Sequence, residues 1–273
     1  MGRLAMETDV AEVRALLKTM LALFNALSIM ILLQHPVCLG QSQRVITFQT
    51  NNSDPAQFGY ECRENGGPGV GPCSIAVNGE VAFVVDNYHD NIKKLDLASG
   101  SIQTTNRSTS AEHKRWFRDV TVLHDKVIVS SDLDFLYVYD VDLRLLDSLY
   151  VKRGASYFRW LDDSLTLCSP FDGTTYRVFV REGKVTVETS GASFYEMSQF
   201  VTTAHGRNYR MINRDDSWRL QSRNSTFKLL RKIHTVECYD AINIDISGES
   251  LVYFEIGPKG LRFYLSLQDD CDR

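Results

Sequence analysis

The sequence lacks an excess of positive charge. Its 273 residues include 30 Lys and Arg against 34 Asp and Glu, which gives a formal net charge of −4 at pH 7. A nucleic-acid surface needs basic side chains to neutralise the phosphates of its ligand. We therefore expect no nucleic-acid partner.

The sequence also lacks the motifs of several catalytic and metal-binding classes. It contains no Gly-rich loop that could hold a phosphate, no His pair at helical spacing and no recognisable order of catalytic Ser, His and Asp. The spacing of its six Cys and six His residues matches no zinc site. We expect neither a metal nor another cofactor.

Only one apolar run near the N-terminus could concern a membrane. Met20–Leu33 is fourteen residues long and uncharged, whereas a transmembrane helix needs about 20 residues. Its length fits the apolar region of a signal peptide, and cleavage would fall near Gly40. We expect residues 1–40 to be a signal peptide or a signal anchor, and residues 41–273 to form one secreted or extracytoplasmic domain. If the apolar run is retained, the protein is anchored to a membrane.

Four short β-prone runs follow one another between Gly71 and Thr105. They are Ser74–Val77, Glu80–Asp86, Asn91–Leu97 and Ser101–Thr105, and each ends in turn-forming residues. This pattern predicts a four-stranded antiparallel meander. Such a meander is too small to bury its own faces, so it implies further copies stacked beside it.

The same pattern returns downstream. Alignment of the turns between second and third strands places Asp86, Asp132 and Asp172 in register, at spacings of 46 and 40 residues. A period of about 40–50 residues with four strands per unit is typical of β-propeller blades. We therefore expect an all-β propeller of four-stranded antiparallel blades.

The blade count rests on the first strand of each unit. These strands are expected near Ser74, Asp119, Tyr157, Gln199 and Ala241, which gives five blades. A degenerate sixth blade in Pro55–Gly71 is the alternative. The last unit, Tyr239–Leu267, contains only three strands, and the isolated strand Arg44–Gln49 can supply the fourth and close the propeller.

The residues of the first unit resemble a known repeat. Pro72 precedes its first strand, Val84-Val85-Asp86 ends its second, and Ile92-Lys93-Lys94-Leu95-Asp96 forms its third. This arrangement resembles NHL-type and related six-bladed propeller families over about 35 residues, and the later units resemble them weakly. The resemblance implies a propeller fold. It says little about chemistry, because these families include scaffolds, receptors and hydrolases.

One face of such a propeller collects the loops between second and third strands and the loops between blades. Aromatic and charged residues gather there: Tyr88, His89, Asp90, Trp116, Asp132, Asp134, Phe171, Asp172 and Trp218. Exposed aromatics interleaved with charge are typical of a binding face. Alternatively, each Asp hydrogen-bonds its own turn and the two Trp pack between blades. The main hypothesis is a non-catalytic module that binds an unknown protein or glycan.

The alternative hypothesis is a glycosidase or lactonase that acts at the central channel. Asp54, Asp119 and Glu237 occur in an order that resembles five-bladed glycosidases of the fructosidase type, and paired carboxylates suit displacement at a sugar carbon. The pattern departs from that family because Glu237 precedes the fifth unit rather than the third. A metal-dependent lactonase would instead need Glu, Asn and Asp side chains that converge on the channel from the ends of first strands, where Asp119, Asp162 and Asp240 lie.

Export would also favour disulfides. Cys62 and Cys73 flank a polar, Gly-rich loop, and a bond between them would stabilise the fold by about 2–3 kcal/mol. Cys238 and Cys271 flank the last unit and could pair in the same way. Cys168 would then be the odd thiol, with a role in core packing.

Overall fold

The computed structural model describes most of the chain between residues 43 and 267. The described residues are 43–61, 70–105, 116–131, 134–151, 157–161, 164–169, 173–190, 202–204, 207–214, 217–221, 226–229, 244–247, 250–257 and 260–267. Their strands belong to one compact unit, Ser42–Asp269. Within these ranges, no helix is long and apolar enough to cross a membrane. The expected signal segment, residues 1–40, lies outside them.

The first sheet is the meander predicted from the sequence. Its strands are β2 (Pro72–Asn78), β3 (Val81–Asp86), β4 (Asn91–Asp96) and β5 (Ile102–Thr104). They pair antiparallel in chain order. Gly79 has a φ of 60° in the tight turn between β2 and β3, a conformation that glycine adopts without steric cost.

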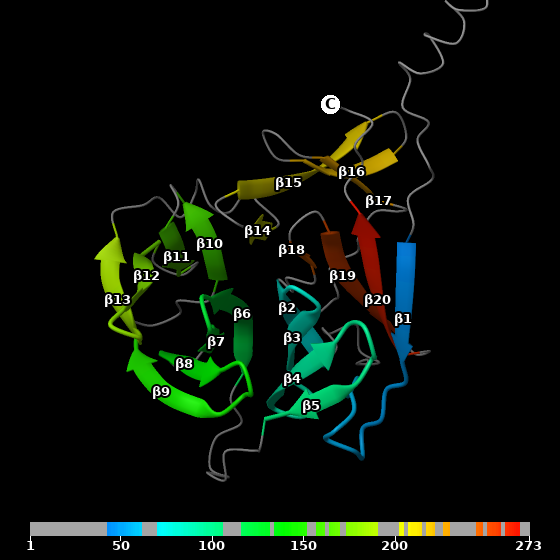
Figure 1. Ribbon diagram of the computed structural model, residues 1–273, viewed down its shortest axis with the longest axis horizontal. Coiled ribbons are helices and arrows are strands. Elements are labelled where there is room, and N and C mark those ends of the chain that lie inside the picture. Colours follow the sequence, from blue (N-terminus) through cyan, green and yellow to red (C-terminus); the bar gives the residue numbers. More distant parts are fainter. Residues whose placement is uncertain are drawn as a thin grey trace, which may run out of the picture. The chain divides into compact units, whose positions relative to one another are not determined.

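Three further sheets repeat this order (Figure 1). The second contains β6 (Phe117–Leu123), β7 (Lys126–Ser131), β8 (Phe135–Asp140) and β9 (Leu145–Tyr150). The third contains β10 (Tyr157–Leu161), β11 (Ser164–Cys168), β12 (Thr175–Arg181) and β13 (Lys184–Ser190). The fourth contains β14 (Thr202–Ala204), β15 (Arg207–Arg214), β16 (Ser217–Gln221) and β17 (Thr226–Leu229). Positions 132 and 172 fall between second and third strands, as the alignment with Asp86 predicts.

The first two sheets also share an irregularity. In the first sheet the register shifts between Pro72, opposite Asp86, and Ser74, opposite Val85. In the second it shifts at the matching place, between Phe117 and Asp119. A bulge re-aims the side chains next to it. The repeat therefore extends to backbone detail, which the spacing of residues alone did not predict.

The fifth sheet combines the two ends of the described chain. It contains β18 (Ile244–Ser247), β19 (Ser250–Gly257), β20 (Gly260–Leu267) and β1 (Gln43–Phe48), in the order β1-β20-β19-β18. The pairing of the N-terminal strand with the last unit is thus confirmed. Gly260 is required there, because a Cβ on it would lie 2.3 Å from the backbone oxygen of Phe48.

The segment that could have held a sixth blade forms no strand in its described residues. Between residues 50 and 71 it makes two isolated bridges, Thr50 with Phe58 and Glu61 with Val70. The described part of the chain therefore contains five four-stranded sheets.

The core lies between the sheets rather than on one face of each. In β3, Phe83 and Val85 pack with residues of the second sheet, whereas Ala82 and Val84 pack with residues of the fifth. Because both faces are buried, β3 is apolar without alternation. The first strands are neighbours in space: β2 lies beside β6 and β18, β6 beside β10, and β14 beside β10 and β18.

Candidate functional site

A buried carboxylate fixes the turn between β3 and β4. Asp86 has no exposed surface. Its Oδ1 accepts the backbone N–H of Tyr88 at 3.1 Å, and its Oδ2 accepts the backbone N–H of Gly59 at 3.1 Å. Nδ1 of His89 lies 3.0 Å and Nζ of Lys93 3.4 Å from the same Oδ2. Asp86 therefore ties its own turn to β4 and to the segment that precedes the first sheet.

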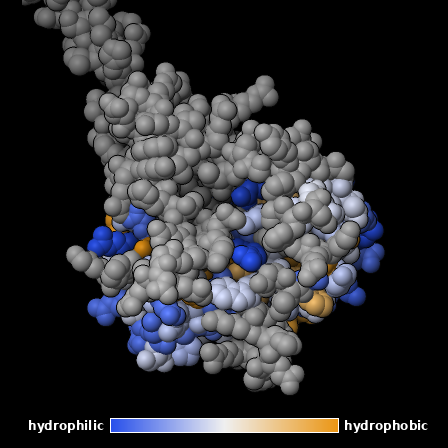
Figure 2. Space-filling view, turned by 180° about the vertical axis from the view of Figure 1, so that it is seen from behind, coloured by the Kyte–Doolittle hydropathy of each residue, from blue (hydrophilic) through white to orange (hydrophobic). Residues whose placement is uncertain are grey.

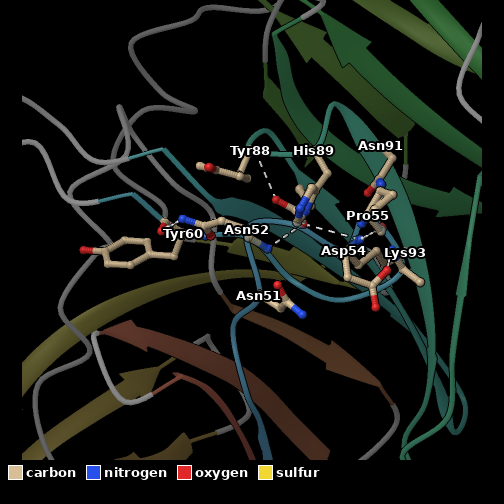
Figure 3. Close-up of polar contacts among 12 residues, drawn as sticks. Asn51, Asn52, Asp54, Pro55, Tyr60, Tyr88, His89, Asn91 and Lys93 are labelled. Carbon is tan, nitrogen blue, oxygen red and sulfur yellow. Dashed lines mark hydrogen bonds and ion pairs between the residues drawn. The ribbon is translucent and has the colours of Figure 1, made fainter.

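Lys93 completes this turn cluster, which we define as Asp86, His89, Lys93 and the segment 54–59. Its side chain is fully buried, and Nζ donates to the backbone oxygen of Pro55 at 2.7 Å (Figure 3). Nζ also lies 5.6 Å from the centre of the Phe58 ring. Burial lowers the pKa of Lys93, and the nearby Asp86 carboxylate opposes this effect. The charge serves to hold the segment against the sheet.

The segment that precedes the first sheet is also held by hydrogen bonds at its ends and by close packing at Gly59. Asn52 pairs with the backbone of Tyr60, accepting its N–H at 2.9 Å and donating to its oxygen at 3.0 Å (Figure 3). A Cβ on Gly59 would lie 2.2 Å from the Tyr88 ring and 2.6 Å from the His89 ring. Only a residue without a side chain fits between them and the strand.

The pair formed by Asp86 and His89 resembles a catalytic base only in part. With its Nδ1–H donated to Asp86, the His89 ring would carry a lone pair at Nε2. This Nε2 is buried and has no hydrogen-bond partner among the described residues. Because His89 is only 4% exposed, a substrate in solution could not reach it without opening the turn.

A second buried carboxylate, Asp119, joins three sheets. Its Oδ1 accepts the Ser74 hydroxyl from β2 at 2.6 Å and the N–H of Val120 at 2.8 Å. Its Oδ2 accepts the backbone N–H of Phe158 from β10 at 2.8 Å. Burial raises the pKa of Asp119 to about 6, although these hydrogen bonds and a nearby Arg oppose the rise.

The neighbours of Asp119 complete a polar junction. Nη1 of Arg159 lies 3.9 Å from Asp119 Oδ2 and donates to the backbone oxygen of Phe158 at 2.7 Å. Cys168 is 2% exposed, and its thiol lies 3.3 Å from the backbone oxygen of Tyr157. Burial raises the pKa of this thiol to about 11, which disfavours the thiolate form. The burial of Cys168 agrees with the predicted role in core packing.

The structure brings part of the predicted binding face together. Asn87, in the β3–β4 turn, donates to the backbone oxygen of Phe117 at 2.9 Å and accepts its N–H at 3.0 Å. Tyr88 and Trp116, both half-buried, are the chain neighbours of these two residues. His89 differs from the prediction of an exposed aromatic, because it is buried and bonded to Asp86.

Two predicted aspartates shape their turns. Asp90 and Asp134 are half-buried, with positive φ values of 53° and 63°. Asp is one of the few non-glycine residues that adopt this conformation readily. The sequence-based alternative, in which a strand-end Asp bonds its own turn, is confirmed for Asp86, which accepts the N–H of Tyr88.

Several predicted residues cannot be placed in a site. Asp132, Asp162, Phe171, Asp172, Glu237, Asp240 and the side chain of Trp218 lie outside the described residues, as do Cys62, Cys238 and Cys271. Cys73 is buried, with Sγ 3.0 Å from Asn87 Nδ2. Its disulfide with Cys62 stays a prediction.

Asp54, another carboxylate of the hydrolase hypothesis, also accepts hydrogen bonds from its own loop. Asp54 Oδ1 accepts the N–H of Ala56 at 2.9 Å, and its Oδ2 accepts the Gln57 side chain at 3.0 Å. Among the described residues, no group of three or more His, Cys, Asp or Glu side chains could hold a metal ion.

An exposed apolar patch on the second sheet was missed by the sequence analysis. It consists of Phe135, Val141, Leu145, Leu146 and Tyr150, which are 36%, 36%, 52%, 51% and 69% exposed. The rings of Phe135 and Tyr150 pack edge to face at 5.9 Å. The adjacent apolar residues Leu145 and Leu146 could have revealed it, although they lie where the register between β8 and β9 shifts, and the alternation of faces along a strand is interrupted there.

Elsewhere the described surface is more polar. The face in Figure 2 is mainly blue and white where residues are described, with small orange areas. Val45 on β1, 47% exposed, is the one other large hydrophobic side chain exposed among the described residues. The apolar patch is therefore a local feature of β8, β9 and the turn between them.

Comparisons with known proteins give no family. No family model matches the chain, and no curated protein matches it. Solved structures with similarity include BamB from Moraxella catarrhalis, at 13% identity and TM-score 0.36, covering 78% of this chain and 69% of that one. The glutaminyl cyclase of Myxococcus xanthus matches at 11% identity and TM-score 0.33, covering 69% and 95%. The computationally designed Ika4 protein matches at 10% and 0.33, covering 58% and 89%. The resemblance to NHL-type families stays a prediction.

Proposed function

We propose that this chain is an exported five-bladed β-propeller that acts as a non-catalytic binding module. Its ligand, a protein or a glycan, would meet the end of the sheets that carries the β3–β4 turn. The propeller is supported by the five four-stranded sheets, by the contacts between their first strands, and by β1 as the fourth strand of the last sheet.

The rigid β3–β4 turn is the observation that carries the binding proposal. Asp86 bonds the turn, the Lys93 ammonium and the segment at Gly59, and Asn87 bonds the start of β6. A turn fixed on all these sides can present Tyr88 without losing conformational entropy when a ligand binds. Tyr88 and Trp116 would be the aromatic anchors, and the Asp groups around them would orient the ligand.

The use of the carboxylates favours binding over hydrolysis. Asp54 and Asp119 both direct their oxygens to hydrogen-bond donors of the scaffold. A glycosidase needs a pair of carboxyl groups facing one sugar. The third carboxylate of that hypothesis, Glu237, lies outside the described residues.

Export and membrane attachment are proposals that rest on the sequence. The uncharged run Met20–Leu33 supports a secretory signal. Retention of the run would anchor the propeller at the membrane, and cleavage would release it. The Cys62–Cys73 disulfide belongs to the same proposal, because it needs an oxidising compartment.

The binding proposal can be tested with paired variants of the full chain. The wild type is expected to bind a glycan on a glycan array or, when immobilised, to retain a ligand from an extracytoplasmic extract. Tyr88→Ser and Trp116→Ser should each weaken this retention at least tenfold, because central aromatic anchors dominate binding energy. Val141→Ser, in the apolar patch, is the matched control and should retain the ligand.

The same preparation tests the alternative. Aryl glycosides and lactones should show no turnover with the wild type. If the wild type turns over one of these compounds and Asp54→Asn abolishes the turnover, the protein is a hydrolase and not a binding module. Retention that survives both aromatic substitutions would overturn the proposed face.

A further inference from the structure

Three segments of the chain have the pattern Asn-x-Ser or Asn-x-Thr, which marks an acceptor for an N-linked glycan in an exported protein. They begin at Asn51, Asn106 and Asn224. Of these three asparagines, only Asn51 belongs to the described residues, where it lies in the loop after β1. The binding function proposed above makes no use of it.

The loop holds Asn51 by its backbone and by its side-chain oxygen. Its N–H donates to the backbone oxygen of Phe58 at 2.8 Å, and its carbonyl oxygen accepts the N–H of Asp54 at 3.4 Å. Oδ1 of its side chain accepts the N–H of Ser53 at 3.0 Å, which is an Asx turn. Because an N–H group can donate only to the oxygen of a carboxamide, this bond identifies the other end of the side chain as Nδ2.

The nitrogen of this carboxamide is left open to another group. Nδ2 of Asn51 makes no hydrogen bond within the described part of the chain, and it is not one of the buried polar atoms without a partner found there. It is therefore in contact with solvent. Ser53, whose hydroxyl completes the acceptor pattern, is exposed.

The neighbouring asparagine shows the opposite arrangement. Asn52 uses both ends of its carboxamide, since Oδ1 accepts the N–H of Tyr60 and Nδ2 donates to the Tyr60 oxygen (Figure 3). A sugar on Nδ2 of Asn52 would compete for space with the backbone of Tyr60. A sugar on Nδ2 of Asn51 would displace only water. The fold thus leaves accessible the amide that the pattern selects.

We propose that Asn51 carries an N-linked oligosaccharide after passage through a secretory compartment, an inference that rests on the proposed export. In this step a bond forms between Nδ2 of Asn51 and C1 of the first sugar of a lipid-linked oligosaccharide pyrophosphate. The bond between C1 and the pyrophosphate oxygen breaks, the pyrophosphate leaves with the electron pair, and the amide gives up one proton. No group is oxidised or reduced. Such a glycan is bulky and soluble, and the solvent contact of Nδ2 leaves it outside the folded domain.

Translation of the full chain with eukaryotic secretory microsomes tests the site and the export separately. Resistance to added protease reports entry into the vesicles, and a mass decrease after digestion with an N-glycanase reports the glycan. Asn51→Gln should lose one glycan relative to the wild type. Ser53→Ala should lose the same glycan, because it removes the hydroxyl of the pattern, whereas Ser53→Thr should keep it.

The matched control is Asn52→Ala. It keeps the acceptor pattern at Asn51 but removes both hydrogen bonds to Tyr60, so it should keep the glycan. A glycan that is lost in Ser53→Ala and kept in Asn52→Ala depends on the acceptor pattern and not on an undisturbed loop. The N-glycanase leaves Asp in place of the glycosylated Asn, so peptide mass spectrometry of the wild type assigns the site.

Two results would overturn the glycan and leave export standing. One is a chain that enters the vesicles but has no sugar on Asn51. The other is an unchanged number of glycans in Asn51→Gln, because the sugar would then lie on another asparagine. A chain that stays outside the vesicles would overturn export, and the glycan with it, because the transfer takes place inside. None of these results affects the proposed ligand face at Tyr88 and Trp116.

Discussion

Replacement of Asp119 by Asn tests how the buried junction between three sheets is held. The carboxylate accepts Ser74 and Val120 at one oxygen and Phe158 at the other. An Asn side chain can present an oxygen on one side only. Its NH₂ group would then face the N–H of Phe158, and two buried donors would lie together. Leaving one buried N–H unsatisfied costs about 1–3 kcal/mol.

The pH dependence of the same substitution has a definite sign. The pKa of Asp119 is raised from 3.8 to about 6 by burial, which corresponds to about 3 kcal/mol. The folded state therefore binds the proton more tightly than the unfolded state. The stabilisation is complete below pH 3.8 and is lost as the pH rises through 6. The Asp119→Asn variant has no such proton to bind.

The free energy of unfolding should be measured by urea denaturation of both proteins between pH 4 and 7. The free energy of unfolding of the wild type minus that of Asp119→Asn should fall by about 2.4 kcal/mol across this range. The control is Asp125→Asn, at a fully exposed site where the hydrogen bond from Lys126 lowers the pKa of Asp125. The free energy of unfolding of the wild type minus that of Asp125→Asn should rise with pH instead of falling. A difference for Asp119 that is flat or rises with pH would refute the reasoning, because the hydrogen bonds would then outweigh burial.

Two further substitutions test the scaffold around the proposed face. Lys93→Met should lower the free energy of unfolding by about 3 kcal/mol, because it leaves the buried Asp86 and the Pro55 oxygen without their cation. The control is the neighbouring Lys94→Met, which removes a surface ion pair with Asp142 and should cost less than about 1 kcal/mol. Equal costs in urea denaturation would contradict the role of the buried ammonium. Phe48→Ala should cost about 2 kcal/mol, because the ring packs 5.7 Å from both Phe58 and Phe263 and is half-buried. Val45→Ala, on the exposed side of β1, should change stability by no more than about 0.5 kcal/mol. A Phe48→Ala protein as stable as the wild type would show that β1 does not complete the fifth sheet in solution.

The repeat was readable from the sequence because local signals agree with it. Asn78-Gly79 and Ser99-Gly100 mark turns whose glycines have φ values of 60° and 76°. Strands between such turns must pair antiparallel. The fourth strand of the last sheet was also predictable, since Arg44–Gln49 had no local partner and the last unit lacked one strand.

The candidate site was readable only in part. The sequence could mark Tyr88, His89 and Asp90 as turn residues, but not that His89 turns inward to a carboxylate at the end of β3. The burial of Lys93 was not predicted from the sequence. Its burial depends on Pro55 and Phe58, which lie more than thirty residues earlier in the chain, so no local pattern records it.

The sequence by itself determined the strands, their turns and the repeat, because hydrogen bonding and alternation act over a few residues. Tertiary structure alone decided which polar groups are buried and which apolar groups are exposed. Asp119 has its three partners only because β2, β6 and β10 meet, and Tyr150 is exposed only because β9 is the last strand of its sheet. Burial is a property of the neighbours that the fold brings together, and the chain order does not fix it.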